Sequence, residues 1–385
     1  MTANMITCDF PPGVIITRGA IKQLGTEIRK FSDGPVLLVS DGGVESAGIV
    51  ATAEAVLREN GLEFATWLGV EENPTSETVA RGVRFAETLK PELIVGLGGG
   101  SSMDCAKGIN FILTNGGTMK DYWGIGKASK ALLPMIAVPT TAGTGSETQS
   151  FALISDPDTH VKMACGGEKA ACRTALLDPE LTLTQPRSVV VATGIDAISH
   201  AIESAVTTKR TPTSDRYARQ AWILLAHYFK TVLDNPENME AREAMQTGAM
   251  FAGAAIENSM LGAAHALANP LTARYGITHG PAVALMLPHV IRFNGPEVDD
   301  IYQTLIESAK ISNTNEQCPA ELLADYITSL LTASELPQNL ADYNIPETDI
   351  PALAKDAATQ WTAQFNPRRI TPEDMFRLYT EAHHD

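Results

Sequence analysis

Residues 93–104 read Leu-Ile-Val-Gly-Leu-Gly-Gly-Gly-Ser-Ser-Met-Asp, and this stretch indicates the fold class of the first half of the chain. Its apolar start predicts a buried strand, and the glycines lead directly into a helical stretch, Cys105–Leu113. Glycines at such a turn let backbone N–H groups approach a pyrophosphate, and the start of the helix adds partial positive charge. A simpler interpretation is a tight strand-to-helix turn with Ser102 or Asp104 as the helix cap.

Working outward from this turn, buried apolar runs alternate with amphipathic stretches through the first half of the chain. Strands are predicted at 35–40, 64–70, 93–97 and 135–139, and helices at 50–59 and 76–89. Apolar strands separated by helices are typical of a parallel sheet that is covered on both faces. We therefore predict a Rossmann-like α/β domain over residues 1–187.

The pattern changes at about Pro186, where strand-like runs give way to long alanine-rich stretches. Helices are predicted at Ser214–Leu233 and Met239–Leu267, and Asn-Pro pairs at 235–236, 269–270 and 366–367 mark turns or helix ends. An all-α domain is expected over residues 188–385.

Composition narrows the class of protein. A formal charge of −16 repels phosphate backbones, so we expect no binding to nucleic acid. The sequence has neither a long apolar run nor a secretory signal at its start, so we expect no membrane association. Five scattered cysteines without a Cys-x-x-Cys pair favour a reducing compartment. These features predict a soluble cytoplasmic enzyme.

A second loop, Pro-Thr-Thr-Ala-Gly-Thr-Gly-Ser-Glu at 139–147, follows the fourth predicted strand. Its small residues and hydroxyls suit phosphate or ribose, and two such loops at the carboxyl ends of parallel strands face one crevice. Asp41 ends the first predicted strand, where it could bind both hydroxyls of a ribose or cap the next helix. Because the glycines come after this acidic residue, the order differs from the usual dinucleotide fingerprint.

Four residues of the second half, Asp196, His200, His265 and His279, form a candidate metal site. Asp196 and His200 lie four apart in a predicted helix and project from the same face. Three imidazoles and one carboxylate suit a borderline divalent ion such as iron or zinc.

Each of these residues also has a purely structural explanation. Asp196 has capping-box spacing from Thr193, and His200 could be a core histidine on an apolar helix. His265 could find a polar partner within an alanine-rich helix, and His279 could simply precede a helix. The set is harder to explain in this way, because three of the chain's eight histidines would each need a separate buried partner.

Three stretches together resemble the iron-containing, or group III, alcohol dehydrogenases: Gly-Gly-Gly-Ser-Ser-Met-Asp (98–104), the loop at 139–147, and Ala-Thr-Gly-Ile-Asp-Ala-Ile-Ser-His-Ala-Ile-Glu (192–203). The likeness extends to Phe-Asn-Pro-Arg-Arg at 365–369. It implies the dehydroquinate synthase-like fold of that family, with a dinucleotide-binding domain, a helical metal-binding domain and a cleft between them. It also implies NAD rather than NADP, Fe²⁺ with Zn²⁺ as the alternative, and a homodimer or larger assembly.

The resemblance assigns site residues. The metal ligands fall on Asp196, His200, His265 and His279, through which the metal would act in catalysis. The cofactor contacts fall on Asp41, Asn73, Gly99, Gly100, Ser101, Asp104, Thr140, Thr141 and Lys162. One position departs from the family, because Asn269 stands where many members have a second histidine near the nicotinamide. An amide does not titrate near neutral pH, so a proton relay would need water or His289 instead.

The predicted reaction is the NAD-linked interconversion of an alcohol with its aldehyde or ketone, in which the cation lowers the pKa of the hydroxyl and the dinucleotide takes the hydride. A phosphorylated or acidic substrate, as for a dehydroquinate synthase-like relative, would need several Lys or Arg in 196–206 and 251–270, where there are almost none. A hydroxyacid–oxoacid transhydrogenase that retains its NAD is a further alternative. A catalytically silent nucleotide-binding protein is the third, and the intact ligand set argues against it.

Overall fold

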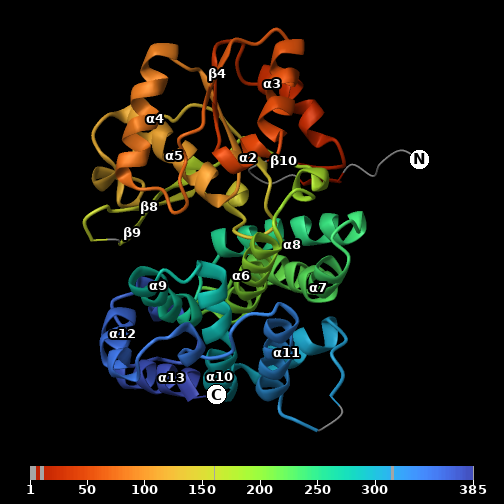
Figure 1. The fold of residues 1–385 in the computed structure, drawn as a ribbon, viewed down its shortest axis with the longest axis vertical. Helices are drawn as coiled ribbons and strands as arrows, with labels where there is room; N and C mark the ends of the chain where they lie inside the picture. The colour runs from red at the N-terminus through yellow and green to blue at the C-terminus, as the bar shows by residue number, and fades with distance from the viewer. Residues whose placement is uncertain (1–5, 9–12, 160, 314–315, 385) are drawn as a thin grey trace. The chain divides into compact units, whose positions relative to one another are not determined.

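The computed structural model describes residues 6–8, 13–159, 161–313 and 316–384. It divides into two compact units, residues 1–185 and 186–385. The first unit combines strands with helices, and the described part of the second contains helices but no strand (Figure 1). The predicted fold class, a parallel α/β region followed by a helical one, is confirmed.

A seven-stranded sheet forms the centre of the first unit, in the order β1-β2-β10-β7-β5-β3-β4. Neighbouring strands run parallel except β1 and β2, which are antiparallel. The strands are β1 (Ile6–Cys8), β2 (Gly13–Ile16), β3 (Val36–Val39), β4 (Phe64–Trp67), β5 (Leu93–Gly98), β7 (Met135–Pro139) and β10 (Thr174–Leu177). The central strands are apolar throughout because helices cover both faces of the sheet.

Helices α1 (Leu24–Arg29) and α3 (Ile49–Glu59) bury their apolar sides against one face of the sheet. Helices α4 (Ser76–Leu89) and α5 (Gly100–Asn115) lie on the opposite side of the strands from α3 (Figure 1). Helix α5 lies close to β5 at Gly96, where a Cβ would lie 2.8 Å from Met135 Cε and 3.4 Å from the Cα of Met103. The short helix α2 (Gly42–Ser46) follows β3.

The predicted strands and helices of this unit are present, but the sequence prediction missed several strands. Strands β1, β2 and β10 extend the sheet beyond β7, and a second sheet has the order β6-β9-β8. Its strands are β6 (Gly124–Ile125), β8 (Phe151–Ser155) and β9 (Lys162–Gly166). These strands are only two to five residues long. Such short segments give too few alternations to distinguish a strand from a loop.

The second unit is built around α6 (Arg187–Val206), which packs against α7, α8 and α10. The remaining helices are α7 (Pro212–Asp234), α8 (Met239–Glu257), α9 (Ala263–Tyr275), α10 (His279–Ser308), α11 (Pro319–Ala333), α12 (Ile350–Ala357) and α13 (Pro372–His384). By length and hydropathy alone α6 could cross a membrane, but 83% of its apolar window is buried inside the protein. It is a core helix.

Two helix predictions in this unit are wrong. The single helix predicted over Met239–Leu267 is two helices, because the chain turns at residues 258–262 between α8 and α9. The Asn269-Pro270 pair does not end a helix: α9 continues through Pro270. A proline removes one backbone donor from a helix, which weakens the helix but does not have to end it. The pair at 235–236 does end α7, whose C-cap is Asn235.

Candidate metal centre and nucleotide loops

Helix α6 carries Asp196 and His200 on one buried face. The helix begins at Arg187, nine residues before Asp196, so Asp196 does not cap it and the capping-box explanation fails. The side chains of Asp196 and His200 are each 6% exposed, and His200 Nε2 lies 3.5 Å from Asp196 Oδ1.

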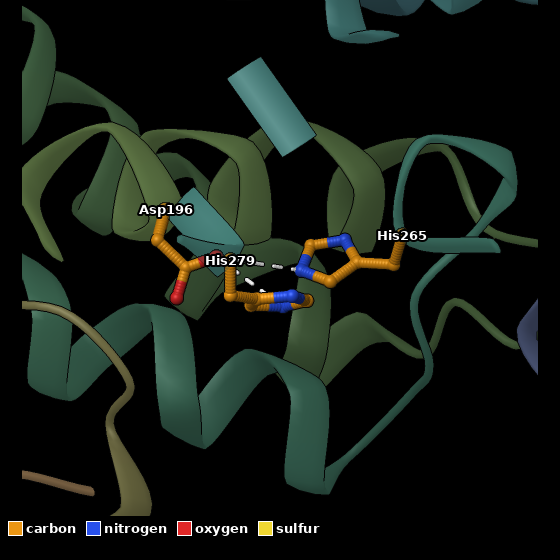
Figure 2. Close-up of side chains that lie close together, drawn as sticks. All are labelled: Asp196, His265 and His279. Atoms are coloured by element: carbon orange, nitrogen blue, oxygen red, sulfur yellow. Dashed lines mark ion pairs between the residues drawn. The ribbon is translucent and has the colours of Figure 1, made fainter. Parts of the chain in front are cut away.

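His265 from α9 and His279 from α10 point at the same carboxylate oxygen (Figure 2). The Nε2 atoms of His265 and His279 lie 3.6 and 3.9 Å from Asp196 Oδ1. The rings of His200 and His265 stack with centroids 4.9 Å apart, and the rings of His265 and His279 lie 5.3 Å apart. The structure thus brings all four predicted ligands together around one oxygen.

The start of α10 reaches α6 because residue 280 is a glycine. A Cβ on Gly280 would lie only 1.9 Å from the backbone oxygen of Ala192, one turn before Asp196. The position of His279, the neighbouring residue, therefore depends on a contact between the backbones of α10 and α6. Any side chain at position 280 would prevent this contact.

The electrostatics of this cluster favour a positive charge. Burial alone would raise the pKa of Asp196, but the imidazoles of His200, His265 and His279 hold it well below its usual range. Burial opposes a charge on His265, yet the carboxylates of Glu203 and Asp196 outweigh this effect and raise its pKa to about 9. Without a cation, this cluster would therefore retain a proton on His265 at neutral pH.

A divalent metal fits this cluster. Asp196 Oδ1 and His265 Nε2 are buried, and neither has a hydrogen-bond partner among the described residues. One ligand atom each from Asp196, His265 and His279 can be chosen so that all three lie within 4.8 Å of one another. Ligand atoms bound at ~2.1 Å around a tetrahedral ion lie about 3.4 Å apart, close to the Nε2–Oδ1 distances found here.

Glu203 belongs to this centre, although the sequence prediction did not include it. Its Oε2 lies 2.5 Å from His265 Nδ1, on the side of the ring that faces away from Asp196. Asp196, His200 and Glu203 are spaced i, i+4 and i+7, so they share one helical stripe. This spacing was the signal in the sequence that could have identified Glu203.

Asn269, at the position where the resemblance would place a second histidine, is held by a neighbouring amide. It lies one turn after His265 in α9, and its Nδ2 donates to Gln360 Oε1 at 2.9 Å. His289 is buried in α10.

The predicted nucleotide loop forms the start of α5. Its N-cap is Gly99 and has no side-chain cap, so neither Ser102 nor Asp104 caps this helix. Ser102 Oγ instead donates to Asp41 Oδ2 at 2.9 Å. Asp104 accepts from Ser146 Oγ at 2.5 Å and from the backbone of Leu153 at 3.0 Å. Asp104 thus joins α5 to the second loop and to β8.

The two predicted loops lie against each other. Thr140 N donates to the Gly98 carbonyl at 2.9 Å, at the ends of β7 and β5. A Cβ on Gly100 would lie 2.7 Å from Thr144 Cγ2, and one on Gly99 would lie 3.3 Å from Thr141 Cγ2. Side chains at these two positions would therefore push the loops apart.

Asn73 and Lys162 also lie near the first loop. Asn73 has a left-handed backbone, with φ of 52°, and its N–H donates to Ser101 Oγ at 3.3 Å. Burial raises the pKa of Asp104 above its usual range. The positive charge of Lys162, in β9, offsets a part of this rise, so Lys162 lies near Asp104. Seven of the nine predicted cofactor residues therefore follow β3, β5 or β7 directly or lie in the first turns of α5, and Asn73 and Lys162 are linked to them through Ser101 and Asp104.

Lys107 is a further residue of this region that the sequence did not reveal. It is 1% exposed, and its Nζ donates to the carbonyls of Ser146, Gln149 and Phe151 at 2.7 to 2.9 Å. It therefore holds the end of the second loop against α5. A single lysine in a predicted helix gives no signal of such burial, because lysine is normally exposed.

The chain is similar to known proteins over nearly its whole length. Residues 11–179 match the family model described as iron-containing alcohol dehydrogenase, and residues 190–383 match the model for the C-terminal part of that family. An NAD-dependent methanol dehydrogenase from Bacillus methanolicus is 34% identical, in an alignment that covers 97% of this chain and 98% of the relative. A 1,3-propanediol dehydrogenase from Klebsiella pneumoniae is 33% identical, in an alignment that covers 94% of this chain and 95% of the relative.

A solved structure of a 1,3-propanediol oxidoreductase superposes on this chain with a TM-score of 0.93 and is 31% identical in sequence. The superposition covers 99% of this chain and 100% of the solved chain. The predicted class of enzyme, a metal-dependent oxidoreductase that acts on alcohols, is confirmed by these likenesses. Over nearly its whole length, the chain belongs to the iron-containing alcohol dehydrogenase family.

Proposed function

We propose that this enzyme interconverts a primary alcohol and its aldehyde, with NAD as the hydride acceptor. The observation that carries the proposal is the convergence of three imidazoles on the buried carboxylate of Asp196, in a chain whose relatives include dehydrogenases of methanol and 1,3-propanediol. Residues 1–187 are the NAD-binding domain and residues 188–385 the metal-binding domain.

In the second domain, Asp196, His200, His265 and His279 are the metal ligands, and Fe²⁺ is favoured over Zn²⁺. A bound divalent cation supplies Lewis acidity, which lowers the pKa of an alcohol hydroxyl or polarises a carbonyl. Three neutral imidazoles and one carboxylate as ligands leave a positive charge on the bound ion, because Glu203 contacts His265 rather than the ligand position and offsets this charge only from a distance. The low pKa of Asp196 keeps this carboxylate ionised across the physiological range.

The substrate is an uncharged small alcohol. Residues 196–206 contain two acidic side chains and no lysine or arginine, so this part of the centre offers no partner for a phosphate or carboxylate. Asn269 cannot take up a proton, and its amide donor is bonded to Gln360. The hydroxyl proton therefore leaves through water rather than through a side chain at position 269.

In the first domain, the dinucleotide supplies the redox chemistry and the loops position it. The start of α5 presents the backbone N–H groups of Gly100 and Ser101, and no side chain caps this helix. Free N–H groups and the partial positive charge of a helix start suit a pyrophosphate. Asp41 favours NAD, because its carboxylate would repel the 2′-phosphate of NADP.

The enzyme is a cytoplasmic homodimer or larger assembly. The free, buried cysteines Cys105, Cys165 and Cys172 are compatible with a reducing compartment. Light scattering after size exclusion would measure the assembly, and a monomeric mass would contradict it.

The activity is tested with a panel of primary and secondary alcohols and their carbonyl products, assayed with NAD(H) and NADP(H) after loading with Fe²⁺ or Zn²⁺. We expect NADH formation with short primary alcohols, and loss of the activity after chelation. Failure of every primary alcohol and aldehyde in the metal-loaded protein would refute the proposal. Exchange between an alcohol and a carbonyl compound without added cofactor would instead identify a transhydrogenase.

A further inference from the structure

The carboxylate of Glu203 is matched to two donors at the start of α9. Its Oε1 accepts the backbone N–H of Ala264 at 2.7 Å, and its Oε2 lies 2.5 Å from His265 Nδ1. The side chain is 4% exposed, so both contacts are sheltered from water. Glu203 therefore contacts both the ring of a proposed metal ligand and the backbone that carries it.

The start of α9 has no cap of its own. Its N-cap is Gly262, and the first N–H groups are satisfied by other segments: Ala263 donates to Asn366 Oδ1 at 3.3 Å and Ala264 to Glu203. A Cβ on Gly262 would lie 3.0 Å from Glu203 Oε1 and 3.1 Å from Asn366 Oδ1. The glycine thus lets both acceptors reach the helix start. A carboxylate there is also favoured by the partial positive charge of the helix.

The contact with Glu203 also determines which ring nitrogen of His265 carries the proton. A neutral imidazole has one donor nitrogen and one acceptor nitrogen, and a carboxylate only accepts. In the neutral ring the proton therefore lies on Nδ1, which leaves the lone pair on Nε2, 3.6 Å from Asp196 Oδ1. This is the tautomer that can bind a metal through Nε2.

We propose that Glu203 is a positioning residue that selects the metal-binding tautomer of His265 and fixes the start of α9. The proposal rests on the metal site proposed above. Helix α6 then supplies two ligands, Asp196 and His200, and the group that orients a third. Glu203 itself does not contact the substrate or the ion.

A glutamine at position 203 cannot replace the carboxylate, because it offers only one acceptor. If its oxygen faces Ala264 N–H, its NH₂ faces His265 Nδ1 and favours the tautomer with the proton on Nε2. If the amide is turned over, its NH₂ faces the Ala264 N–H. In the first orientation the proton lies on the nitrogen that would bind the metal, and in the second two donors face each other. Metal binding is therefore weakened in both, although the shape of the side chain is conserved.

The test compares Co²⁺ binding by the metal-free full-length wild type, Glu203→Gln and Ser199→Ala, by chelator competition and by the visible spectrum of the bound ion. Ser199 lies in the same helix, is fully buried and donates only to the Ile195 carbonyl, so it controls for loss of a buried polar group. We expect the dissociation constant of Glu203→Gln to rise about 10- to 100-fold, the range found for groups that orient metal ligands. Ser199→Ala should bind as the wild type does, and Glu203→Asp, which keeps a carboxylate, should bind more tightly than Glu203→Gln.

The outcomes separate this inference from the proposed function. A wild type that binds no Co²⁺ or Zn²⁺ contradicts the metal site itself. A wild type that binds Co²⁺ while Glu203→Gln matches its affinity and spectrum overturns the role of Glu203 alone. If Glu203→Gln does not fold, nitrogen NMR of the metal-free wild type at a pH where His265 is neutral decides: a proton on Nδ1 of His265 supports the proposal, and one on Nε2 excludes it.

Discussion

Ser102 Oγ donates a 2.9 Å hydrogen bond to Asp41 Oδ2, which joins the first turn of α5 to the end of β3. The other oxygen of Asp41 accepts from the backbone N–H groups of Gly43 and Val44 at the start of α2. Both oxygens of Asp41 are therefore already in use, one in a helix cap and one against the glycine loop. A carboxylate oxygen can accept more than one bond, so a ribose hydroxyl could still be added.

Replacing Asp41 by Asn separates these two roles. An asparagine keeps an oxygen for the cap of α2 and places an NH₂ where Ser102 Oγ can accept, so the fold should be preserved. If the negative charge excludes a 2′-phosphate, KM for NADP⁺ should fall by about tenfold or more, which corresponds to ~1.4 kcal/mol. Steady-state kinetics with both cofactors measure the ratio, and an unchanged preference would leave Asp41 as a cap only.

A methyl group at position 100 should separate the two nucleotide loops. Gly100→Ala places a Cβ 2.7 Å from Thr144 Cγ2, so one of the loops must move and NAD⁺ affinity should fall about tenfold or more. Gly13→Ala is the matched control, because its Cβ would have no neighbour closer than 3.8 Å. Titration of protein fluorescence with NADH measures both variants. Equal affinities would argue against a role for this loop in binding.

Removal of His265 or His279 should abolish turnover and leave NAD⁺ binding largely intact. The reason is that the metal ligands come from α9 and α10, whereas the nucleotide loops belong to the first unit. Metal analysis and NADH titration should be done on the same preparations, with His227→Ala, an exposed histidine in α7, as the control. A variant that keeps its metal but loses NAD⁺ would contradict this division.

Metal affinity should increase with pH up to about 9. In the metal-free protein the pKa of His265 is raised to about 9, so below that pH a proton must leave before Nε2 can bind an ion. Each displaced proton changes the apparent affinity by about tenfold per pH unit. Chelator competition between pH 6.5 and 8.5 measures the slope, together with proton release into a weak buffer. A flat profile would show that His265 is neutral before the metal binds.

Glu147, in the second loop, should make the first unit less stable as the pH rises. Burial raises its pKa to about 7 from 4.5, so the folded state binds a proton more tightly than the unfolded chain. Stability should therefore fall between pH 4.5 and 7 and level off above, by up to about 3 kcal/mol from this group. Glu147→Gln removes this loss, so its Tm relative to wild type should be higher at pH 8 than at pH 5. A constant difference in Tm would mean that Glu147 is not protonated in the fold.

The sequence was a good guide wherever local pattern decides structure. Val36–Val39 and Leu93–Gly98 could be predicted because each is an uninterrupted apolar run before a glycine-containing turn, and Ser76–Leu89 because its apolar residues recur with the helical period. Asp196 and the three histidines of the proposed metal site could be identified from residue chemistry and the family resemblance together. Their convergence lies in tertiary packing, notably the contact of Gly280 with Ala192, which no periodicity reveals.

The sequence was a poor guide where the partner of a residue is distant in the chain. Glu203 reads as an ordinary helix residue until α9 brings Ala264 and His265 to it, about sixty residues later. Lys107 looks like a surface lysine until the carbonyls at 146–151 surround it. The uninterrupted course of α9 through Pro270 likewise depends on surrounding packing that outweighs the local preference.

Since the proposed ligands stem from α6, α9 and α10, the complete set exists only when these three helices are folded together. An ion that binds this set and not the unfolded chain adds its own binding energy to the folded state. Cells starved of iron or zinc should then accumulate less of the protein, because proteases would reach residues 186–385 more often. The yield of intact chain from a culture would report on its metal supply as well as on expression.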